Sequence, residues 1–334
     1  MKMNQELNQD CALIALDWGT SSLRCYRFDG SGQVVERRAH PWGIMNLPAV
    51  GHGEDAQAPY RAALEAACAD WLKAAPAAPL IAAGMVGSKQ GWREAAYLNV
   101  PLAPALIGRQ LTEVDTGLGR PLWIVPGLLE QGTLPNVMRG EETQVLGALP
   151  SLPNDDVLIG LPGSHSKWVQ VADGCIQHFD TFMTGEVFAV LSEHSILGRT
   201  QQRGGTFDAD AFDRGVQVAL SSEGDIGPLS TLFSARTLGL TGDLSATAQA
   251  DYLSGLLIGH ELAALANAQR QRRNSAHLPA VVLIGSGPLC VRYDRALQAC
   301  GFGAASVAEH ATERGLWQLA LAAGLVRASP LPVL

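Results

Sequence analysis

Two short turns rich in glycine and hydroxyl residues carry the clearest chemical signal in the sequence. The first, Asp17-Trp18-Gly19-Thr20-Ser21-Ser22, follows an apolar run, and the second, Gly163-Ser164-His165-Ser166, follows another. Turns of this type present free backbone N–H groups and hydroxyls, which suit a phosphate. The candidate phosphate-binding residues are therefore Gly19, Thr20, Ser21 and Ser22 in the first turn, and Gly163, Ser164, His165 and Ser166 in the second.

The two turns occupy matching positions in the two halves of the chain. Gly19 aligns with Gly163, Thr20 with Ser164 and Ser22 with Ser166, and the alignment continues without a gap to the next turn, at Asp29-Gly30 and Asp173-Gly174. The order strand, tight turn, strand, turn is thus repeated, which predicts a duplicated chain. Two such turns facing each other would hold a polyphosphate between two domains.

The two turns differ in their charged residues. Asp17 ends an apolar run, where a carboxylate can hold the hydration shell of Mg²⁺, whereas the second turn has Leu161 at that place. Asp17 could equally cap its own backbone in an ordinary β-turn. The second turn offers Lys167, which either reaches a phosphate as a point charge or is a solvated strand residue.

Two adjacent acids follow a glycine in the segment Arg139-Gly140-Glu141-Glu142. At a helix N-terminus such acids commonly serve as dipole and capping residues. The alternative is that Glu141 is the base that orients a substrate hydroxyl during phosphoryl transfer. Asp17 is the rival for that role.

A third group of polar residues follows the short apolar run Leu80–Ala83. The glycines in the segment 84–92 leave room for a ligand, and an acidic substrate would require a cation, for which Lys89, Arg93 and Arg139 are unranked candidates. Trp42-Gly43-Ile44-Met45 either lines the same pocket or belongs to the core. The candidate substrate-binding residues are Gly84, Ser88, Lys89, Gln90 and Arg139.

Gly285-Ser286-Gly287 stands between an apolar run and an expected helix. This arrangement brings a backbone close to a phosphate or a planar ligand. It is not the dinucleotide-binding fingerprint, because no third glycine follows at the required place. Its position late in the second half suits the adenosine side of a nucleotide site.

Alternating strands and helices must position these residues. Apolar runs and turn residues predict strands at 11–17, 22–28, 34–39, 80–83 and 122–125, and then at 157–161, 167–171, 175–182 and 280–284. Helices are expected at 59–75, 141–149, 185–194, 208–221, 246–270, from about 287 to 300, and at 311–327. The segment 93–139 is rich in proline and glycine and is otherwise unassigned.

This order predicts an α/β protein with two mixed sheets. Breakers and polar residues cluster in Pro150–Asp156, the expected linker. We therefore expect domains at 1–150, with the first phosphate turn, and 151–334, with the second. The last helix can pack back toward the first domain.

Composition limits the class of protein. The chain has 334 residues, of which 47% are hydrophobic and 17% charged, so it can bury large cores and two domains are expected. A net charge of −8 argues against nucleic acid or an anionic membrane as a partner. The six cysteines form no C-x-x-C pair, and most are expected to be reduced core residues. The polar N-terminus and the lack of a long apolar stretch predict a cytoplasmic protein. Whether it forms a homodimer is left open.

The turns at Asp17 and Gly163, together with Gly285-Ser286-Gly287, resemble the phosphate 1, phosphate 2 and adenosine segments of the actin-like ATPase (ribonuclease H-like) fold. More closely, five segments are similar to the 2-dehydro-3-deoxygalactonokinase family: 15–24, 84–92, 138–144, 161–169 and 254–262. The specific feature is Leu-Pro-Gly-Ser-His-Ser-Lys-Trp combined with Arg-Gly-Glu-Glu. The similarity extends over nearly the whole chain.

The resemblance implies two duplicated domains with a cleft between them that closes over the ligands. It also implies ATP-dependent phosphorylation of 2-dehydro-3-deoxy-D-galactonate at its 6-hydroxyl, with Mg²⁺. Related carbohydrate kinases carry their base in a Gly-Asp-Gln segment, and here Gly140-Glu141-Glu142 occupies that place, with the longer glutamate. The nucleotide and the sugar acid would be the partners.

Three rival functions share this fold. A sugar-sensing repressor would carry a helix-turn-helix before the first strand, and an ATPase coupled to partner proteins would need large insertions. The sequence has room for neither. A kinase for another sugar acid or an aldose remains open.

Overall fold

The computed structural model describes residues 11–51, 55–152, 156–202 and 204–327. These residues divide into two compact units. The first runs up to Ser151 and also takes in Gly174–His178 and the segment from Glu309, whereas the second comprises the remainder between Leu152 and Ala308. The expected boundary near residue 150 thus lies beside the division, but the segment from Glu309, which contains the last helix, groups with the first unit.

The first unit is built on a six-stranded mixed sheet in the order β3-β2-β1-β4-β7-β6. β1 is antiparallel to β2 and parallel to β4. β1 is apolar because it lies inside the sheet with both faces covered, and its only partly exposed residue is Asp17. The strands are β1 (Leu13–Trp18), β2 (Leu23–Phe28), β3 (Val34–His40), β4 (Leu80–Ala83), β6 (Thr112–Asp115) and β7 (Pro121–Ile124).

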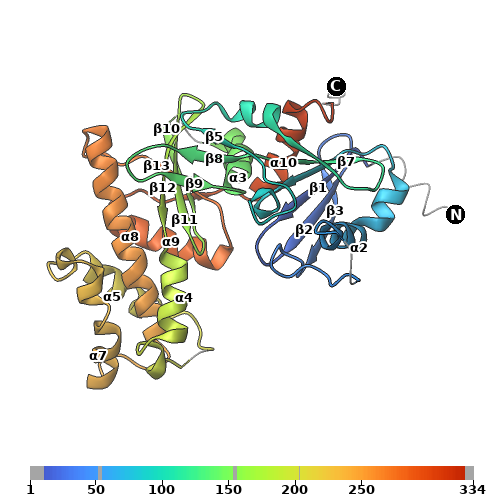
Figure 1. Cartoon of the computed structure of the whole chain (residues 1–334). Helices are drawn as coiled ribbons and strands as arrows, with labels where there is room; N and C mark the ends of the chain where they lie inside the picture. Colours follow the sequence, from blue (N-terminus) through green and yellow to red (C-terminus); the bar gives the residue numbers. More distant parts are fainter. Residues whose placement is uncertain (1–10, 52–54, 153–155, 203, 328–334) are drawn as a thin grey trace. The chain divides into compact units, whose positions relative to one another are not determined.

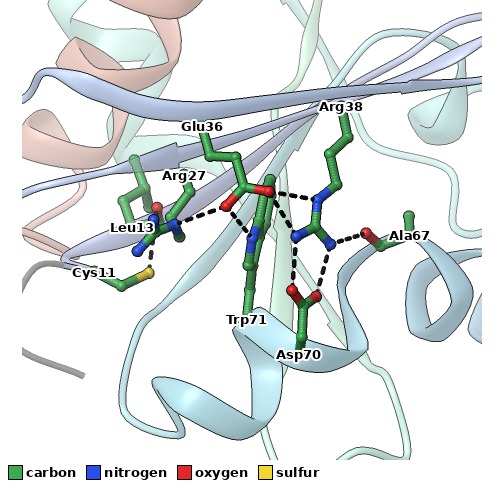
Figure 2. A network of polar contacts seen from close by, with 8 residues as sticks. All are labelled: Cys11, Leu13, Arg27, Glu36, Arg38, Ala67, Asp70 and Trp71. Carbon is green, nitrogen blue, oxygen red and sulfur yellow. Dashed lines mark hydrogen bonds and ion pairs between the residues drawn. The ribbon is translucent and has the colours of Figure 1, made fainter. Parts of the chain in front are cut away.

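Helix α2 (Ala58–Ala74) packs its apolar stripe into the core of the first unit. The helical spacing predicted this stripe, which is buried at Tyr60, Ala63, Leu64, Ala67 and Trp71. A polar network fastens α2 to β3 (Figure 2), in which Arg38 binds the Asp70 carboxylate through two nitrogens, at 2.6 and 2.7 Å. The Trp71 indole donates to Glu36, which also accepts from Arg38.

A second, small sheet of the first unit escaped sequence prediction. It has the order β5-β8-β9, from β5 (Tyr97–Asn99), β8 (Gly127–Glu130) and β9 (Asn136–Met138). Two 3₁₀ helices, η1 (Met85–Gly87) and η2 (Pro104–Gln110), also lie in this part of the chain. These elements are three to seven residues long and interrupted by proline and glycine, so no periodicity marks them.

Helices α3 (Glu141–Ala148) and α10 (Ala311–Ala322) cross in the first unit, and the short η3 (Leu149–Ser151) follows α3. The crossing depends on glycine, because a Cβ at Gly147 would overlap the Ala311 carbonyl and one at Gly315 would overlap the Thr143 carbonyl. The Arg314 guanidinium donates to the Gly147 carbonyl at 2.8 Å. Backbones in direct contact therefore hold α10 on α3.

The second unit repeats the sheet of the first. Its strand order is β12-β11-β10-β13-β14, so β10, like β1, lies between an antiparallel neighbour and a parallel one. The expected duplication into two ribonuclease H-like sheets flanked by helices is confirmed. The strands are β10 (Asp156–Leu161), β11 (Ser166–Ala172), β12 (Cys175–Phe182), β13 (Ala280–Leu283) and β14 (Ser306–Val307).

Helices of the second unit gather around α8 (Gln249–Arg273), the long orange helix in Figure 1. Backbone contact again sets the packing, because a Cβ at Gly255 would overlap the Phe212 carbonyl of α5. The other helices are α4 (Thr184–His194), α5 (Ala209–Ala219), α6 (Pro228–Thr231), α7 (Ser234–Thr241) and α9 (Gly287–Ala299), with two 3₁₀ turns, η4 (Gly198–Thr200) and η5 (Gly224–Ile226).

The predicted helices and strands are all present, with boundaries shifted by at most five residues. The largest shift is in α10, which ends at Ala322 rather than at 327. Sequence analysis also missed β6, α6, α7 and β14. Residues 153–155 of the expected linker lie outside the described residues. All six cysteines are free thiols, and within the described ranges no helix has the length and apolarity to cross a bilayer.

Candidate functional site

The first phosphate turn is held from behind by the segment that follows β3. Gly19 N donates to Ser22 O at 2.9 Å and closes the turn, while the carbonyls of Gly19 and Thr20 accept from Ile44 N and Met45 N at 3.0 and 3.1 Å. A Cβ at Gly43 would overlap the Thr20 carbonyl. The side chains of Thr20 and Ser21 are exposed, so the turn presents its hydroxyls outward on a fixed backbone.

Asp17, in β1, precedes this turn and lies among charged neighbours. Its Oδ2 accepts from Arg24 Nη1 at 3.0 Å, across the β1–β2 pair. Burial raises the pKa of Asp17 above its ordinary value, the Arg24 guanidinium opposes this rise, and the Glu313 carboxylate on α10 adds to it. Two carboxylates from β1 and α10 therefore interact at this end of the sheet.

Two tight backbone contacts bring the N-terminus of α3 to the same end of the sheet. Gly84 follows β4 with φ +96°, and a Cβ there would stand 2.8 Å from the Trp18 carbonyl oxygen. Gly140 precedes α3 with φ +110°, and a Cβ there would stand 3.3 Å from Gly84 Cα. Both conformations favour glycine. These contacts, from Trp18 to Gly84 and from Gly84 to Gly140, place Glu141 near the end of β1, the strand that carries Asp17.

The two acids that begin α3 differ in exposure. Glu142 is fully buried and accepts from Gly140 N at 2.6 Å and from Thr143 Oγ1 at 3.1 Å. Burial raises the pKa of Glu142 to about 8, and the neighbouring Glu141 carboxylate adds to that rise. Glu141 is only partly buried and accepts from Arg139 N at 3.1 Å. Glu142 thus shapes the turn, and Glu141 is the acid within reach of solvent.

The candidate substrate cations separate clearly by burial. Lys89, Arg93 and the neighbouring Gln90 are exposed, whereas Arg139 is 8% exposed. Arg139 donates one hydrogen bond to Ala95 O, at 2.8 Å, and lies over the Tyr97 ring at 4.2 Å. Its Nε and Nη1 have no hydrogen-bond partner among the described residues.

Gly87, the residue before Ser88, lies beside this guanidinium, since a Cβ there would stand 3.0 Å from Arg139 Nη1. The Ser88 hydroxyl is likewise buried and unpartnered among the described residues. The segment that carries Ser88 and the Arg139 guanidinium are thus close together. Trp42-Gly43-Ile44-Met45 serves mainly to hold the first turn, with Ile44 in the core and Met45 exposed.

The second phosphate turn lies against the N-terminus of α4. Glu186 N donates to Ser164 O at 3.0 Å, and a Cβ at Gly185 would stand 2.8 Å from Ser164 Cα. His165 and Glu186 are joined by a hydrogen bond between the imidazole and the carboxylate. The N-terminus of α4 therefore contacts the turn and donates one of its N–H groups to it. A helix N-terminus suits an anion.

Ser166 and Lys167 follow the turn as the first residues of β11, and both are buried. Ser166 Oγ lies 2.8 Å from the hydroxyl of Tyr293. Lys167 Nζ donates to Thr181 Oγ1 at 2.7 Å. Gly163, Ser164 and His165 are thus the part of the predicted segment that reaches the surface of the turn.

A cavity of about 470 Å³ opens beside the second turn, within the second unit. Its polar side is formed by Gly163 and Ser164 and by the N-termini of α4 and α9, where Gly285 and Gly287 are also exposed. The rest of the wall comes from α4, α8 and α9 and includes several apolar residues. The apolar residues are Phe188, Leu257, Ile258, Pro288 and Leu289, and the polar ones Thr184, Ser254, Ser286, Arg292 and Tyr293. Two helix N-termini beside an apolar wall suit the phosphates and the base of a nucleotide.

The first unit also meets the requirements of Mg²⁺, which takes one or two carboxylates and keeps waters and phosphates as its other ligands. Asp17 and Glu313 supply two carboxylates next to the first turn. No cluster of three or more histidine, cysteine or acidic residues exists in the described parts of the chain. The residues therefore fit a magnesium ion delivered with a nucleotide better than an all-protein metal site.

Comparisons with known proteins show the family to which the chain belongs. The profile of the family described as 2-keto-3-deoxy-galactonokinase matches residues 17–319. The 2-dehydro-3-deoxygalactonokinase of Escherichia coli (strain K12) is 37% identical over 299 residues, which cover 88% of this chain and 92% of the relative. The chain belongs to this family. It is a sugar-acid kinase.

Two further relatives agree with this family assignment. A protein of Rhizobium meliloti (strain 1021), provisionally given the same name, is 36% identical over 306 residues, covering 90% of this chain and 94% of that one. A crystal structure of a protein from Sinorhizobium meliloti, which also carries this name provisionally, is 34% identical in sequence and has a TM-score of 0.79. The match covers 93% of this chain and 98% of that protein's chain. This 2-keto-3-deoxy-galactonokinase family member uses a nucleotide as its phosphate donor.

Several residues of this family member that line or adjoin the sites were missed by sequence analysis. Thr184 and Gly185 begin a helix about twenty residues after the second turn, Arg292 lies within α9, and Glu313 lies in the last helix. None belongs to a glycine or hydroxyl motif. One feature of the sequence did indicate the cavity. Segment 254–262 is similar to the family, and this segment contains the cavity residues Ser254, Leu257 and Ile258.

Proposed function

We propose that this chain transfers the γ-phosphate of ATP to the 6-hydroxyl of 2-dehydro-3-deoxy-D-galactonate, with Mg²⁺. The observation that carries the proposal is 37% identity, over 88% of the chain, to a protein named for this activity. The cavity of the second unit supports a nucleotide donor, since it combines two helix N-termini with an apolar wall.

We assign recognition of the sugar-acid carboxylate to Arg139. It is the buried member of the three candidate cations, and two of its nitrogens lack partners among the described residues. An isolated buried charge is costly, and a carboxylate can pair with it through two parallel hydrogen bonds. The buried hydroxyl of Ser88, which follows Gly87 in the chain, is a further candidate donor.

In the proposed reaction, the 6-hydroxyl oxygen attacks the γ-phosphorus and the bond to the β-phosphate oxygen breaks, which releases ADP. Glu141 orients the hydroxyl and accepts its proton, because it is the partly exposed acid at the N-terminus of α3. When bound, Mg²⁺ supplies positive charge to the phosphate oxygens, and Asp17 and Glu313 are the residues that would hold its water shell. The N–H groups and hydroxyls of the phosphate turns stabilise the charge that develops.

A coupled assay of ADP release tests this function. The panel comprises 2-dehydro-3-deoxy-D-galactonate, other 2-keto-3-deoxy sugar acids, aldoses and water, and the phosphate position in the product is read by NMR. We expect kcat/KM to be highest for 2-dehydro-3-deoxy-D-galactonate, with a 6-phosphate product. A higher kcat/KM for another acid would show that this acid is the preferred substrate. ADP release without any acceptor would contradict the proposal.

A further inference from the structure

A buried carboxylate lies behind the wall of the nucleotide cavity, in the part of α8 that resembles the family. Glu261 is 3% exposed and does not itself line the cavity. The proposed reaction gives it no role. A buried carboxylate is costly unless hydrogen bonds satisfy it, so its partners indicate what it does.

Glu261 accepts hydrogen bonds from three different elements. Trp168 Nε1 of β11 donates to its Oε1 at 2.6 Å, and the Tyr293 hydroxyl of α9 donates to its Oε2 at 2.9 Å. The Thr184 hydroxyl, at the start of α4, also hydrogen-bonds to it. The carboxylate therefore ties α8 to the strand after the second phosphate turn and to both helices whose N-termini meet the cavity.

Two of these donors are themselves part of the cavity wall, namely Thr184 and Tyr293. Tyr293 also connects the carboxylate to the second phosphate turn. Because its one hydroxyl hydrogen is donated to Glu261, it accepts from Ser166 Oγ, which lies 2.8 Å away. One charge thus fixes the direction of every hydroxyl in the chain Ser166–Tyr293–Glu261.

Protonation would reverse part of this arrangement. A neutral carboxylic acid is a donor at one oxygen, so either the Tyr293 hydroxyl or the Trp168 N–H would lose its acceptor. Burial raises the pKa of Glu261 to about 7, against the opposing effect of its three hydrogen bonds. In the described chain the titratable group facing it is Tyr293, while α4 and β11 face it with Thr184 and Trp168, which do not titrate.

We propose that ionised Glu261 is a positioning residue for the nucleotide: through Thr184, Tyr293 and Ser166 it sets the wall of the cavity and the second phosphate turn. The inference rests on the proposed binding of ATP in this cavity. It follows that loss of the charge should weaken ATP binding more than it slows the chemical step.

The variant Glu261→Gln tests this, because it keeps the shape and removes the charge. We expect KM for ATP to rise about tenfold or more, with a much smaller change in kcat and in KM for the sugar acid. Leu265→Ala is the matched control, since Leu265 is also fully buried on α8 but does not line the cavity. It should lower the melting temperature and leave KM for ATP unchanged.

The pH profile provides a readout that a purely structural role would not move. KM for ATP of the wild type should rise as pH falls from 8 to 6, and Leu265→Ala, which keeps Glu261, should show the same rise. In Glu261→Gln only the smaller dependence that comes from ATP's own protonation should remain. Trp168→Phe removes one donor to the carboxylate, so the midpoint of the rise should move to higher pH by about one unit.

Three outcomes separate the two proposals. If Ser286→Trp, which adds bulk at an exposed position of the cavity, leaves ATP binding unchanged, the nucleotide assignment of this cavity is wrong. If that variant weakens binding but Glu261→Gln keeps the wild-type KM and pH profile, the role of Glu261 is overturned. If Glu261→Gln fails to fold, Trp168→Phe tests the role of Glu261 instead, through the midpoint of the pH dependence of KM for ATP. A midpoint that stays at the wild-type pH would reject the proposal.

Discussion

Gly185 and Gly163 are in backbone contact, such that a side chain at Gly185 would overlap the carbonyl oxygen of Gly163. The start of α4 can therefore approach the second phosphate turn only if residue 185 is glycine. The φ of Gly185 is not in the left-handed region, so the requirement is one of space.

Gly185→Ala should consequently separate α4 from the turn and weaken ATP binding. Because the obstructing atoms belong to the backbone and cannot rotate away, we expect the Kd for ATP to rise at least about tenfold, which corresponds to about 1.4 kcal/mol. Isothermal titration with ATP measures it. Gly303→Ala is the control, since a Cβ there meets nothing within 4 Å. Equal affinities in the two variants would refute the prediction.

The first phosphate turn should be equally sensitive to Gly43. A Cβ at Gly43 would overlap both the Thr20 carbonyl and the Ser21 amide nitrogen. We expect Gly43→Ala to lower kcat/KM for ATP by at least about tenfold while the protein remains folded. Gly132→Ala is the control in the same unit, because its nearest neighbouring atom would be 3.9 Å away.

Glu141→Ala should lower kcat by about 10²- to 10⁴-fold, as expected for loss of a general base. Binding of ATP, measured by titration, should be retained, because Glu141 belongs to the first unit and does not line the cavity. Asp17→Ala is the informative comparison. If Asp17 is the base, the larger loss of kcat will be in that variant and Glu141→Ala will turn over at a near-normal rate.

Arg139→Met should raise KM for the sugar acid and leave KM for ATP near its wild-type value. The expected factor is about 10²-fold, because a buried bidentate pair with a carboxylate is lost. Arg93→Met and Lys89→Met remove exposed cations nearby and should change KM little. If either variant raises KM for the sugar acid strongly and Arg139→Met does not, the exposed residue, and not Arg139, binds the substrate carboxylate.

Stability should fall as pH rises, because of Glu142. Its folded pKa of about 8 lies above its ordinary value of 4.5, so between these values the folded protein holds a proton that the unfolded chain has released. Its contribution to the free energy of unfolding is complete below about pH 4.5 and is lost as pH rises through 8. The slope is about −1.4 kcal/mol per pH unit within that window.

Glu261, whose pKa is raised to about 7, also makes the free energy of unfolding fall as pH rises, up to about pH 7. Urea denaturation of the wild type and of Glu142→Gln measures the difference, and Glu142→Gln should have the shallower slope. A wild-type protein that becomes more stable across this range would show that other groups dominate.

The sequence predicted the strands of the two large sheets except β6 and β14, because most of them are apolar runs ended by turn residues. The alignment of Gly19 with Gly163 predicted that β1 and β10 occupy the same place in two sheets, which the strand orders confirm. The three-residue strands β5 and β9 bear no such signal, since their side chains alternate over too short a length.

The environment of single side chains was not predictable in the same way. Arg139 follows a polar loop and would ordinarily be exposed, but the overlying Tyr97 ring and the close approach at Gly87 bury it. Glu261 lies in an apolar helix 95 positions after Ser166, with which it shares Tyr293. These relationships depend on tertiary contacts between distant segments, which local pattern does not encode.

The packing of α10 against α3 has a consequence for synthesis of the chain. Residues 11–151 leave the ribosome long before Ala311–Ala322 have been translated, so the backbone of Gly147 is without its partner helix for most of elongation. The nascent first unit therefore lacks α10 until the second unit has been translated. The packing of the first unit is therefore completed late, when α10 has been made.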